Sequence, residues 1–539
     1  MSATVPTTAE NPNTSPEKTP HYLMWFRRDL RLVDNTALAA LCERAHTDNA
    51  RVSAVFFYTP EQWLIHDMSL TQADLIARTL PILAEHLDKQ FNITLQVYVC
   101  PLFSDCIEAM SELCATQNIS LMMANHEYEG GEIARDEQLS KQLATKNIEF
   151  VRWHDQCILP PKSITTTDGS MYQVFTPFYN KWRHTLEVSA LQRHQATLIK
   201  ANNKTNLSAS KLTSASASAH SPDSIAALSV ETIQAYQQRL QDNPLMTHID
   251  RQAQLTHARG AYPAGETAAC HRLDQFIAED IDSYHISRDV PSLQATSQLS
   301  AYLAMGSISV RHCYLQALKA QAQLQGTDSD NNAINRWISE LAWRDFYRHV
   351  LVDKPALIRH QAYKDDTDKR ISWSYHQADF ETWCQGMTGV PLVDAAMRCL
   401  NATGFMHNRL RMVTAMFLTK DLLIDWRLGE RYFMQQLIDG DFASNNGGWQ
   451  WSASTCTDAA PYFRIMNPFS QGKSHDPEGI FIKTWLPELK DIPATVLHSE
   501  DKMRKALKKG GDFAKVAYPQ PMVEHKAARL RAIAEFKKQ

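Results

Sequence analysis

The fold is decided by the run Tyr22-Leu23-Met24-Trp25-Phe26 and by three similar apolar, β-branched or aromatic runs, at 52–58, 93–99 and 119–124. Segments of helical character alternate with these runs, at about 36–44, 69–90, 102–117 and 131–146. Strands that alternate with helices predict a parallel sheet covered on both faces. We therefore expect residues 21–154 to form a Rossmann-like or flavodoxin-like α/β domain whose ligand sits at the carboxyl ends of the strands.

Strand signals fade beyond about residue 267, and the patterns become helical at 267–283, 309–323, 332–352, 392–400 and 407–423. These patterns predict an all-α second domain over 267–530. Residues 155–266 read as a linker, with an exposed Ser/Ala-rich insertion at about 195–222. The first twenty residues have the composition of a disordered tail and lack the features of a signal peptide.

Composition limits the class of protein. The net charge of the 539 residues is −4, so a nucleic-acid surface would have to be a local patch. The ten cysteines include no Cys-x-x-Cys pair and no Cys/His metal spacing, which favours reduced thiols, a cytoplasmic location and no metal site. No apolar run approaches the length of a bilayer span. We expect a soluble protein.

The segment 437–468 concentrates groups that bind ligands. It holds Asp439, Asp441, the amide pair Asn445-Asn446, two adjacent glycines and two tryptophans, with little amphipathic period. A core helix is not expected from this pattern. Polar groups of this kind are costly to bury without partners, so we interpret the segment as a cofactor site, with a Trp-rich structural turn as the alternative.

Three further segments carry candidate ligand groups. Trp337, Glu340 and Arg344 share one helix face with Trp343 beside it, which suits a slot for a planar base or an ordinary ion-paired helix. Asn408, Arg411 and Met412 share a face of another helix, from which Arg409 is expected to point away. His407 is interpreted as a packed or capping residue. The run 296–300 opens a helix with hydroxyls, as either an anion site or an N-cap would.

In this order, these motifs resemble the photolyase and cryptochrome family, most closely the bacterial class I cyclobutane pyrimidine dimer photolyases of the folate type. The resemblance runs from Tyr22 to about Lys526 and includes Trp25-Phe26-Arg27-Arg28-Asp29-Leu30-Arg31-Leu32-Val33-Asp34-Asn35 and Phe175-Thr176-Pro177-Phe178. It implies an antenna-binding α/β domain and a helical domain that holds FAD, active as FADH⁻. It also implies a monomer that takes cyclobutane dimers flipped out of single- or double-stranded UV-damaged DNA and splits them by light-driven electron donation.

The resemblance assigns roles to individual residues. The flavin-binding positions are Tyr284, Thr296, Ser297, Gln298, Leu299, Ser300, Trp337, Glu340, Arg344, Arg411, Asp439, Asp441 and Asn445. The catalytic positions around the flipped dimer are Glu340, Trp343, Asn408, Met412 and Trp451, with Asn445 facing the flavin. The implied electron relay is Trp449, Trp426 and Trp373, and DNA contacts fall on Arg288, Arg409, Trp343 and Trp451. His66, Glu132 and Arg359 match the antenna site.

Several positions depart from the family pattern. Gln298 replaces a basic residue, Phe405 replaces Trp, and Lys473 sits one place early in its loop. Gly131 replaces Asn and Arg359 replaces Lys at the antenna site, which leaves a deazaflavin as the alternative to 5,10-methenyltetrahydrofolate.

Three other functions are considered. A cryptochrome-type blue-light receptor without repair activity would be favoured by Asp or Cys at position 445 and by a long C-terminal tail, and neither is found in this sequence. A (6-4) photolyase would carry histidines in place of Asn408 and Met412. A plain nucleotide-binding α/β protein would leave the helical half unexplained.

Overall fold

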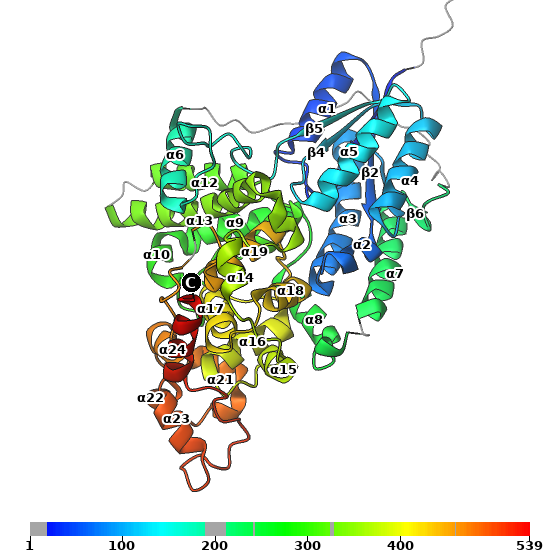
Figure 1. The fold of residues 1–539 in the computed structure, drawn as a ribbon. Coiled ribbons are helices and arrows are strands. Elements are labelled where there is room, and N and C mark those ends of the chain that lie inside the picture. The colour runs from blue at the N-terminus through cyan, green and yellow to red at the C-terminus, as the bar shows by residue number, and fades with distance from the viewer. Residues whose placement is uncertain (1–18, 189–211, 241–242, 324–327, 459, 539) are drawn as a thin grey trace, which may run out of the picture.

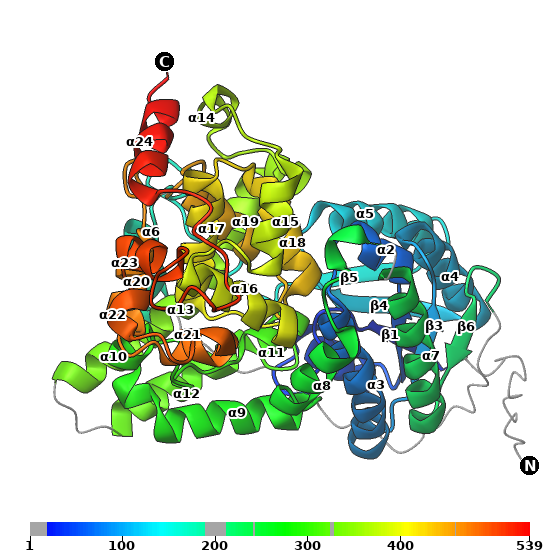
Figure 2. The same cartoon turned by 90° about the horizontal axis from the view of Figure 1, so that it is seen from below.

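The computed structural model describes residues 19–188, 212–240, 243–323, 328–458 and 460–538. A sheet with its helices forms one body, and a larger body made only of helices lies beside it (Figures 1 and 2). The expected order, an α/β unit followed by an all-α unit, is confirmed.

The sheet has six strands in the order β5-β4-β1-β2-β3-β6. The first five in sequence are parallel, and β6 pairs antiparallel with β3 at the edge. The parallel part follows the doubly wound order 3-2-1-4-5, so the topological switch point lies between β1 and β4. The strands are β1 His21–Trp25, β2 Arg51–Tyr58, β3 Leu95–Val99, β4 Ile119–Asn125, β5 Glu149–Trp153 and β6 Ala217–Ala219.

Alternate side chains of β1 enter different cores. Tyr22 and Met24 belong to the core shared with α1 and α3, whereas Leu23 and Trp25 pack with α4 and α5. This two-residue period is what a sheet covered on both faces requires. Four covering helices agree with the predicted ones within a few residues: α1 Thr36–Thr47, α3 Leu70–Phe91, α4 Phe103–Thr116 and α5 Gly130–Ala144. The short helix α2, Pro60–Ile65, was not predicted.

The segment 155–266, predicted as an interdomain linker, contains helices that pack against the two bodies. Helix α6 (Phe175–Val188) packs against α13 of the helical body, while α7 (Pro222–Leu240) and α8 (Arg251–Ala261) pack against α3 of the sheet body. Part of the predicted Ser/Ala-rich insertion, 217–219, forms β6. Backbone pairing with β3 stabilises this edge strand, although Ala and Ser have a low intrinsic preference for strands. Residues 195–211 of that insertion, and 1–18 of the predicted tail, lie outside the described residues.

The helical body contains no strand in the part of the chain after β6 that the structure describes. Its α-helices are α9 Glu266–Glu279, α10 Tyr284–Ser287, α11 Ser300–Met305, α12 Val310–Gln323, α13 Asp328–Asp353, α14 Asp365–Arg370, α15 Gln377–Gln385, α16 Pro391–Thr403, α17 Asn408–Met416, α18 Trp426–Gln436, α19 Phe442–Ala453, α20 Pro468–His475, α21 Ile480–Trp485, α22 Ala494–Leu497, α23 Glu500–Leu507 and α24 His525–Phe536. A turn of π-helix, Phe417–Asp421, follows α17 directly.

The expectation that 437–468 does not form a core helix is wrong for its central part, since α19 runs through 442–453. Asp441 caps this helix by accepting a hydrogen bond from the backbone N–H of Ser444 at 2.9 Å. Only one of the two glycines is required for packing: a Cβ on Gly447 would lie 2.2 Å from the Tyr347 ring, whereas Gly448 faces the open space of a cavity. The amphipathic period is missing because one side of α19 faces a cavity, which takes polar and aromatic side chains together, and not bulk solvent.

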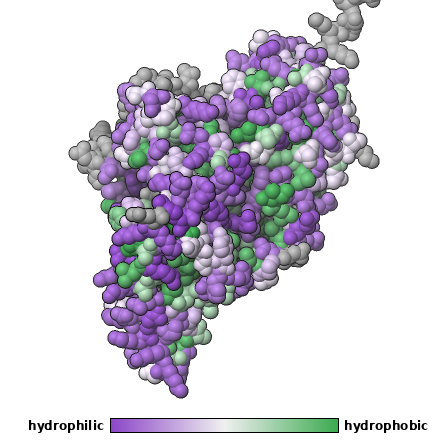
Figure 3. Space-filling model, in the orientation of Figure 1, coloured by the Kyte–Doolittle hydropathy of each residue, from purple (hydrophilic) through white to green (hydrophobic). Residues whose placement is uncertain are grey.

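Two surface features bear on partners. No helix among the described residues is both long enough and apolar enough to cross a membrane. The face of the molecule seen in Figure 3 is mostly hydrophilic, with apolar residues in scattered groups.

Candidate active site

A cavity of about 570 Å³ lies inside the helical body and is here called the helical cavity. Helices α13, α17 and α19, at the centre of that body in Figure 1, supply most of its wall. The structure places every residue expected at the flavin site in this wall, from Tyr284 and the run 296–300 to Asn445, and also every residue expected around the dimer. Their locations fit the expected roles, and the roles themselves stay predictions.

Arg344 brings a positive charge to the wall of the helical cavity. Its guanidinium donates to the carbonyl oxygens of Gln156 and, at 3.1 Å, Leu303, and no carboxylate of the described residues lies within ion-pair distance of it. Burial, together with the neighbouring Arg348, lowers the Arg344 pKa to about 10. A bound anion in the cavity would compensate this charge.

Two carboxylates in the same wall are tightly held. Burial would raise the pKa of Asp441, but Arg348, which bonds to it directly, and Arg344 hold that pKa well below its usual range. Asp439 accepts two hydrogen bonds from one nitrogen of Arg411, at 2.8 and 3.0 Å. These fixed anions and cations can position the polar groups of a dinucleotide.

The amides on α19 are tied to the neighbouring helix α18. Asn445 donates to the backbone carbonyl of Glu430 at 2.9 Å, and Asn446 donates to the Glu430 carboxylate at 2.8 Å. Asn445 lines the cavity, while Asn446 is buried behind it. The position of Asn445 is therefore set by a second helix as well as by its own.

The expected dimer site forms the outer part of the helical cavity. Trp343 is stacked on Phe175 with ring centres 3.7 Å apart and an interplanar angle of 8°. Asn408 is exposed at the start of α17, so the cavity reaches the surface there. Trp451 and Met412 are half-buried in the same wall.

Glu340 and Arg288 form an ion pair, with 2.5 Å between Oε1 and the guanidinium nitrogen. The side chain of Arg288 is only 10% exposed, which is little for a residue expected to contact DNA from the surface. Arg409 pairs with Asp289 at 2.8 Å. Arg409 also lines the helical cavity, although it was expected to point away from the helix face that Asn408, Arg411 and Met412 share.

His407 is the N-cap of α17, which confirms its interpretation as a capping residue. Its Nδ1 accepts from the backbone N–H of Arg409 at 3.1 Å. Burial lowers the His407 pKa to about 4, so the ring is neutral near neutral pH and available as an acceptor.

The three tryptophans expected to carry electrons lie on three different elements. Trp449 lies on α19 in the cavity wall, and its ring packs so closely on Gly429 of α18 that a Cβ there would meet it at 2.1 Å. Trp426 begins α18, and Trp373 lies in the loop after α14. Trp426 and Trp373 do not line the helical cavity.

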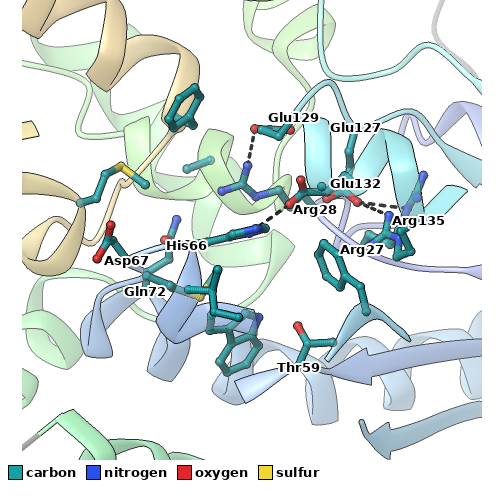
Figure 4. Close-up of a pocket in the computed structure, with 18 of the residues that line it drawn as sticks. Arg27, Arg28, Thr59, His66, Asp67, Gln72, Glu127, Glu129, Glu132 and Arg135 are labelled. Carbon is teal, nitrogen blue, oxygen red and sulfur yellow. Dashed lines mark hydrogen bonds and ion pairs between the residues drawn. The ribbon is translucent and has the colours of Figure 1, made fainter. Parts of the chain in front are cut away.

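A second cavity, of about 360 Å³, lies between the two bodies and is here called the interdomain cavity. It sits at the carboxyl ends of β1, β2 and β4, where the strand order predicts a ligand. Figure 4 shows His66 paired with Glu132, at 3.4 Å, and Arg28 paired with Glu129, at 2.8 Å. The helical body contributes Met305 and His360 to the lining of this cavity.

The antenna residues are only partly brought together. His66, Glu132 and Gly131 line the interdomain cavity, and Gly131 leaves space beside the ring of His66. Arg359 is exposed and does not line this cavity, although its neighbours Ile358 and His360 do. Lys473 is exposed on α20 and lines neither cavity.

Sequence reasoning missed Arg348, Glu430 and Asp368, which hold other site residues in place. Arg348 is one helical turn after Arg344, and this spacing could have indicated it. Glu430 and Asp368 lie far along the chain from the residues they bond to, and no sequence signal points to them.

Comparison with known proteins assigns the family. Residues 22–198 match the DNA photolyase profile, and residues 309–538 match the FAD binding domain of DNA photolyase. The chain is 42% identical over 516 residues to a deoxyribodipyrimidine photo-lyase of Escherichia coli, covering 96% of this chain and 98% of that one.

The chain belongs to the DNA photolyase family.

Solved structures agree with this assignment. A class III photolyase from Agrobacterium tumefaciens is similar with a TM-score of 0.77 at 30% identity, covering 98% of this chain and 99% of that one. A cryptochrome from Synechocystis sp. PCC6803 is similar with a TM-score of 0.75 at 27% identity, covering 96% and 99%. The family expected from the sequence is confirmed, and the fold is shared by repair enzymes and cryptochromes alike.

The helical cavity of this DNA photolyase family member fits FAD. Arg344, which forms no ion pair with a described carboxylate, lines this cavity together with the hydroxyl-bearing Thr296, Ser297 and Ser300, and Gln298 adopts a left-handed φ of 50° in that loop.

We expect Arg344→Gln to lower FAD affinity by about ten- to a hundredfold, the effect of losing one charged hydrogen-bonding group. The measurement is flavin content per chain and FAD titration of the flavin-free protein. Arg398→Gln, which removes an arginine paired with Glu488 outside the cavity, is the control. Equal flavin affinity in the two variants would contradict this role of Arg344.

Proposed function

We propose that the protein is a light-driven DNA repair enzyme that splits cyclobutane pyrimidine dimers, with FAD in the helical cavity. The observation that supports this proposal is the continuity of that cavity. The residues expected around the flavin and those expected around the dimer line one space, which reaches the surface at Asn408. Membership of the photolyase family supports light-driven repair and FAD in particular.

FAD bound in its reduced form supplies the electron that light drives into the dimer. The protein's own task is to bind and orient. Arg344, Arg411 and the ion-paired Asp439 and Asp441 hold charged and polar groups in fixed positions, so little reorganisation is needed during the reaction. Asn445, fixed by its bond to Glu430, lines the same cavity with its amide.

Trp343 and Trp451 are proposed as the walls that receive the flipped dimer. A dimer is weakly paired and stacked in DNA, so its extrusion costs less than that of a normal base. Trp343 is already packed against Phe175, and a wall fixed in advance loses little conformational entropy on binding. Asn408 can bond a base edge, and Met412 can only pack against it.

The Glu340–Arg288 pair refines the role proposed for Glu340. A lone carboxylate would repel negative charge that develops on the dimer. Since Glu340 is paired with Arg288 at 2.5 Å, the two side chains present a net neutral unit whose guanidinium can face that charge. Arg288 thus serves the dimer site, and Arg409 at the mouth is left as the phosphate contact.

The pocket chemistry favours repair over two other activities. Reversal of a (6-4) product needs an acid to move a hydroxyl group, and neither Asn408 nor Met412 is one near neutral pH. A receptor without repair has no need for two aromatic walls around an open mouth. The likeness in fold to the Synechocystis cryptochrome does not separate these functions, so the choice rests on the cavity.

We predict light-dependent repair of a defined thymine-dimer oligonucleotide and no reversal of a (6-4) oligonucleotide. Asn408→Ala should lower dimer binding and repair about three- to tenfold, the value of one hydrogen bond, without changing flavin content. The control is Gln377→Ala, an exposed amide on α15. Efficient (6-4) reversal, or full repair by Asn408→Ala, would contradict the proposed pocket, and dimers left intact by reduced wild type under blue light would contradict the function.

We propose a second chromophore, 5,10-methenyltetrahydrofolate, for the interdomain cavity, with a deazaflavin as the alternative. His66 and Glu132 are the polar groups proposed to hold it. Burial opposes the charged form of each side chain, but their mutual contact raises the His66 pKa and lowers the Glu132 pKa. Both shifts favour the ion pair of protonated His66 with ionised Glu132.

We expect Glu132→Gln to lower the occupancy of the second chromophore several-fold without changing FAD content, because the carboxylate that orients His66 is lost. Arg359→Gln should change neither, since its side chain lies outside the cavity. Absorption spectra and mass analysis of released chromophores give both occupancies and separate folate from deazaflavin. Loss of the chromophore in Arg359→Gln alone would contradict this site.

A further inference from the structure

Two of the three relay tryptophans share one carboxylate. The indole N–H groups of Trp426 and Trp373 donate to the same oxygen of Asp368, at 3.1 and 3.0 Å. Because both bonds meet at one atom, the two indole nitrogens lie within about 6.1 Å of each other. The indole N–H of Trp449, in contrast, has no hydrogen-bond partner among the described residues.

A cation distinguishes the two indoles that share Asp368. The Arg427 guanidinium lies over the Trp426 ring, 4.5 Å from its centre. Bonds to Asp368 at 2.5 Å, to Asp425 at 3.1 Å and to the carbonyl of His360 at 2.7 Å fix it there. Burial opposes the charge, but the two carboxylates raise the Arg427 pKa, so the residue stays protonated.

Trp373 has a different environment. No guanidinium or ammonium lies over its ring in the part of the chain that the structure describes, and its ring packs edge-on against Phe536. The nearby Lys420 contacts the Phe536 ring, 3.3 Å from its centre, instead of an indole. Trp373 is also partly exposed, whereas Trp426 is fully buried.

We propose that Asp368 and Arg427 give the tryptophan relay its outward direction. Asp368 stabilises the oxidised, positively charged state of Trp426 and Trp373 relative to that of Trp449. Arg427 destabilises this state on Trp426 relative to Trp373. This inference rests on the proposed function and on the electron relay that the family resemblance implies, which returns flavin from its oxidised to its reduced form; light-excited oxidised flavin is the one-electron oxidant of that relay. Trp449 loses one electron to the flavin and regains one from Trp426, which regains one from Trp373. An external thiol finally reduces Trp373, and no proton has to leave an indole during the transfers.

Electrostatics gives each residue a separate effect. The Asp368 carboxylate stabilises positive charge on Trp426 and Trp373 almost equally, since its two bonds differ by 0.1 Å. The Arg427 cation repels positive charge mainly on the ring beneath it. Its effect is reduced by its two carboxylate partners and its partial exposure, so we expect it to shift the Trp426–Trp373 equilibrium by about tenfold.

The test is Arg427→Gln in two backgrounds of the full, FAD-loaded protein, with transient absorption of the tryptophan radical after a flash. In the complete relay, the variant should lower the yield of long-lived radical, and of flavin photoreduction by a thiol, about three- to tenfold. With Trp373→Phe, the positive charge stops at Trp426, and Arg427→Gln should then lengthen the radical lifetime at least threefold. A structural defect would lower both readouts.

Companion variants separate the two residues. Asp368→Asn should lower the radical yield in both backgrounds, because the charge then returns to Trp449. Arg427→Lys, which keeps a cation, should restore most of the wild-type yield. Arg504→Gln, which removes an ion pair with Glu500 on α23, should change neither readout. Protein reduced beforehand should repair dimers at the wild-type rate in every Arg427 variant, since repair does not use the relay.

These outcomes separate a failure of the directing role of Arg427 from a failure of the relay itself. If Trp426→Phe leaves thiol-driven photoreduction intact, the proposed relay itself is wrong. If Trp426→Phe blocks photoreduction but Arg427→Gln changes neither readout, or lowers both, the relay stands and the directing role of Arg427 is overturned.

Discussion

Two buried carboxylates of the sheet body, Asp34 and Asp155, pair with Arg311 of the helical body. Asp155 follows the last parallel strand and accepts from Arg31, in the loop after β1, at 2.6 Å and from Arg311, on α12 of the helical body, at 2.8 Å. It also accepts from the backbone N–H of Thr36 at the start of α1. Burial would raise the Asp155 pKa, but the two guanidinium groups hold it well below its usual range. Both cavities depend on this junction.

The chain that leaves Asp155 passes directly to the active site. The next carbonyl, that of Gln156, accepts from Arg344, and two N–H groups just beyond it donate to Asp345 on α13. On the opposite side, the backbone of Arg28 packs so tightly on Gly306 that a Cβ there would lie 2.2 Å from the Arg28 carbonyl oxygen. Ala304, just before that glycine, lines both cavities. The junction therefore fixes the wall of the helical cavity and closes the interdomain one.

The sequence predicts the elements better than the junctions between them. The four strands and four helices expected in the first domain are found within a few residues, since each carries its own period and caps. Helix α19 was missed because its polar face is satisfied by a cavity, and β6 because an edge strand is held by its partner. The motif residues of the helical cavity were found through the family resemblance, but Asp368, Glu430 and Arg348 act through contacts that no local pattern encodes. The pairing of Arg288 with Glu340 and the position of Arg359 likewise depend on tertiary packing.

The most direct test of this account is the free energy of unfolding of Asp155→Asn against wild type, with flavin content measured alongside. We expect a loss of about 3 to 5 kcal/mol at neutral pH, because two buried guanidinium groups lose their charged partner. The depressed pKa of Asp155 stabilises the fold above the pKa of the unfolded carboxyl, so the difference should shrink as the pH falls below about 4. Flavin content should fall too, since Gln156 positions Arg344. An Asp155→Asn protein as stable and as flavin-rich as Asp289→Asn, whose carboxylate pairs with Arg409 at the cavity mouth, would contradict the account.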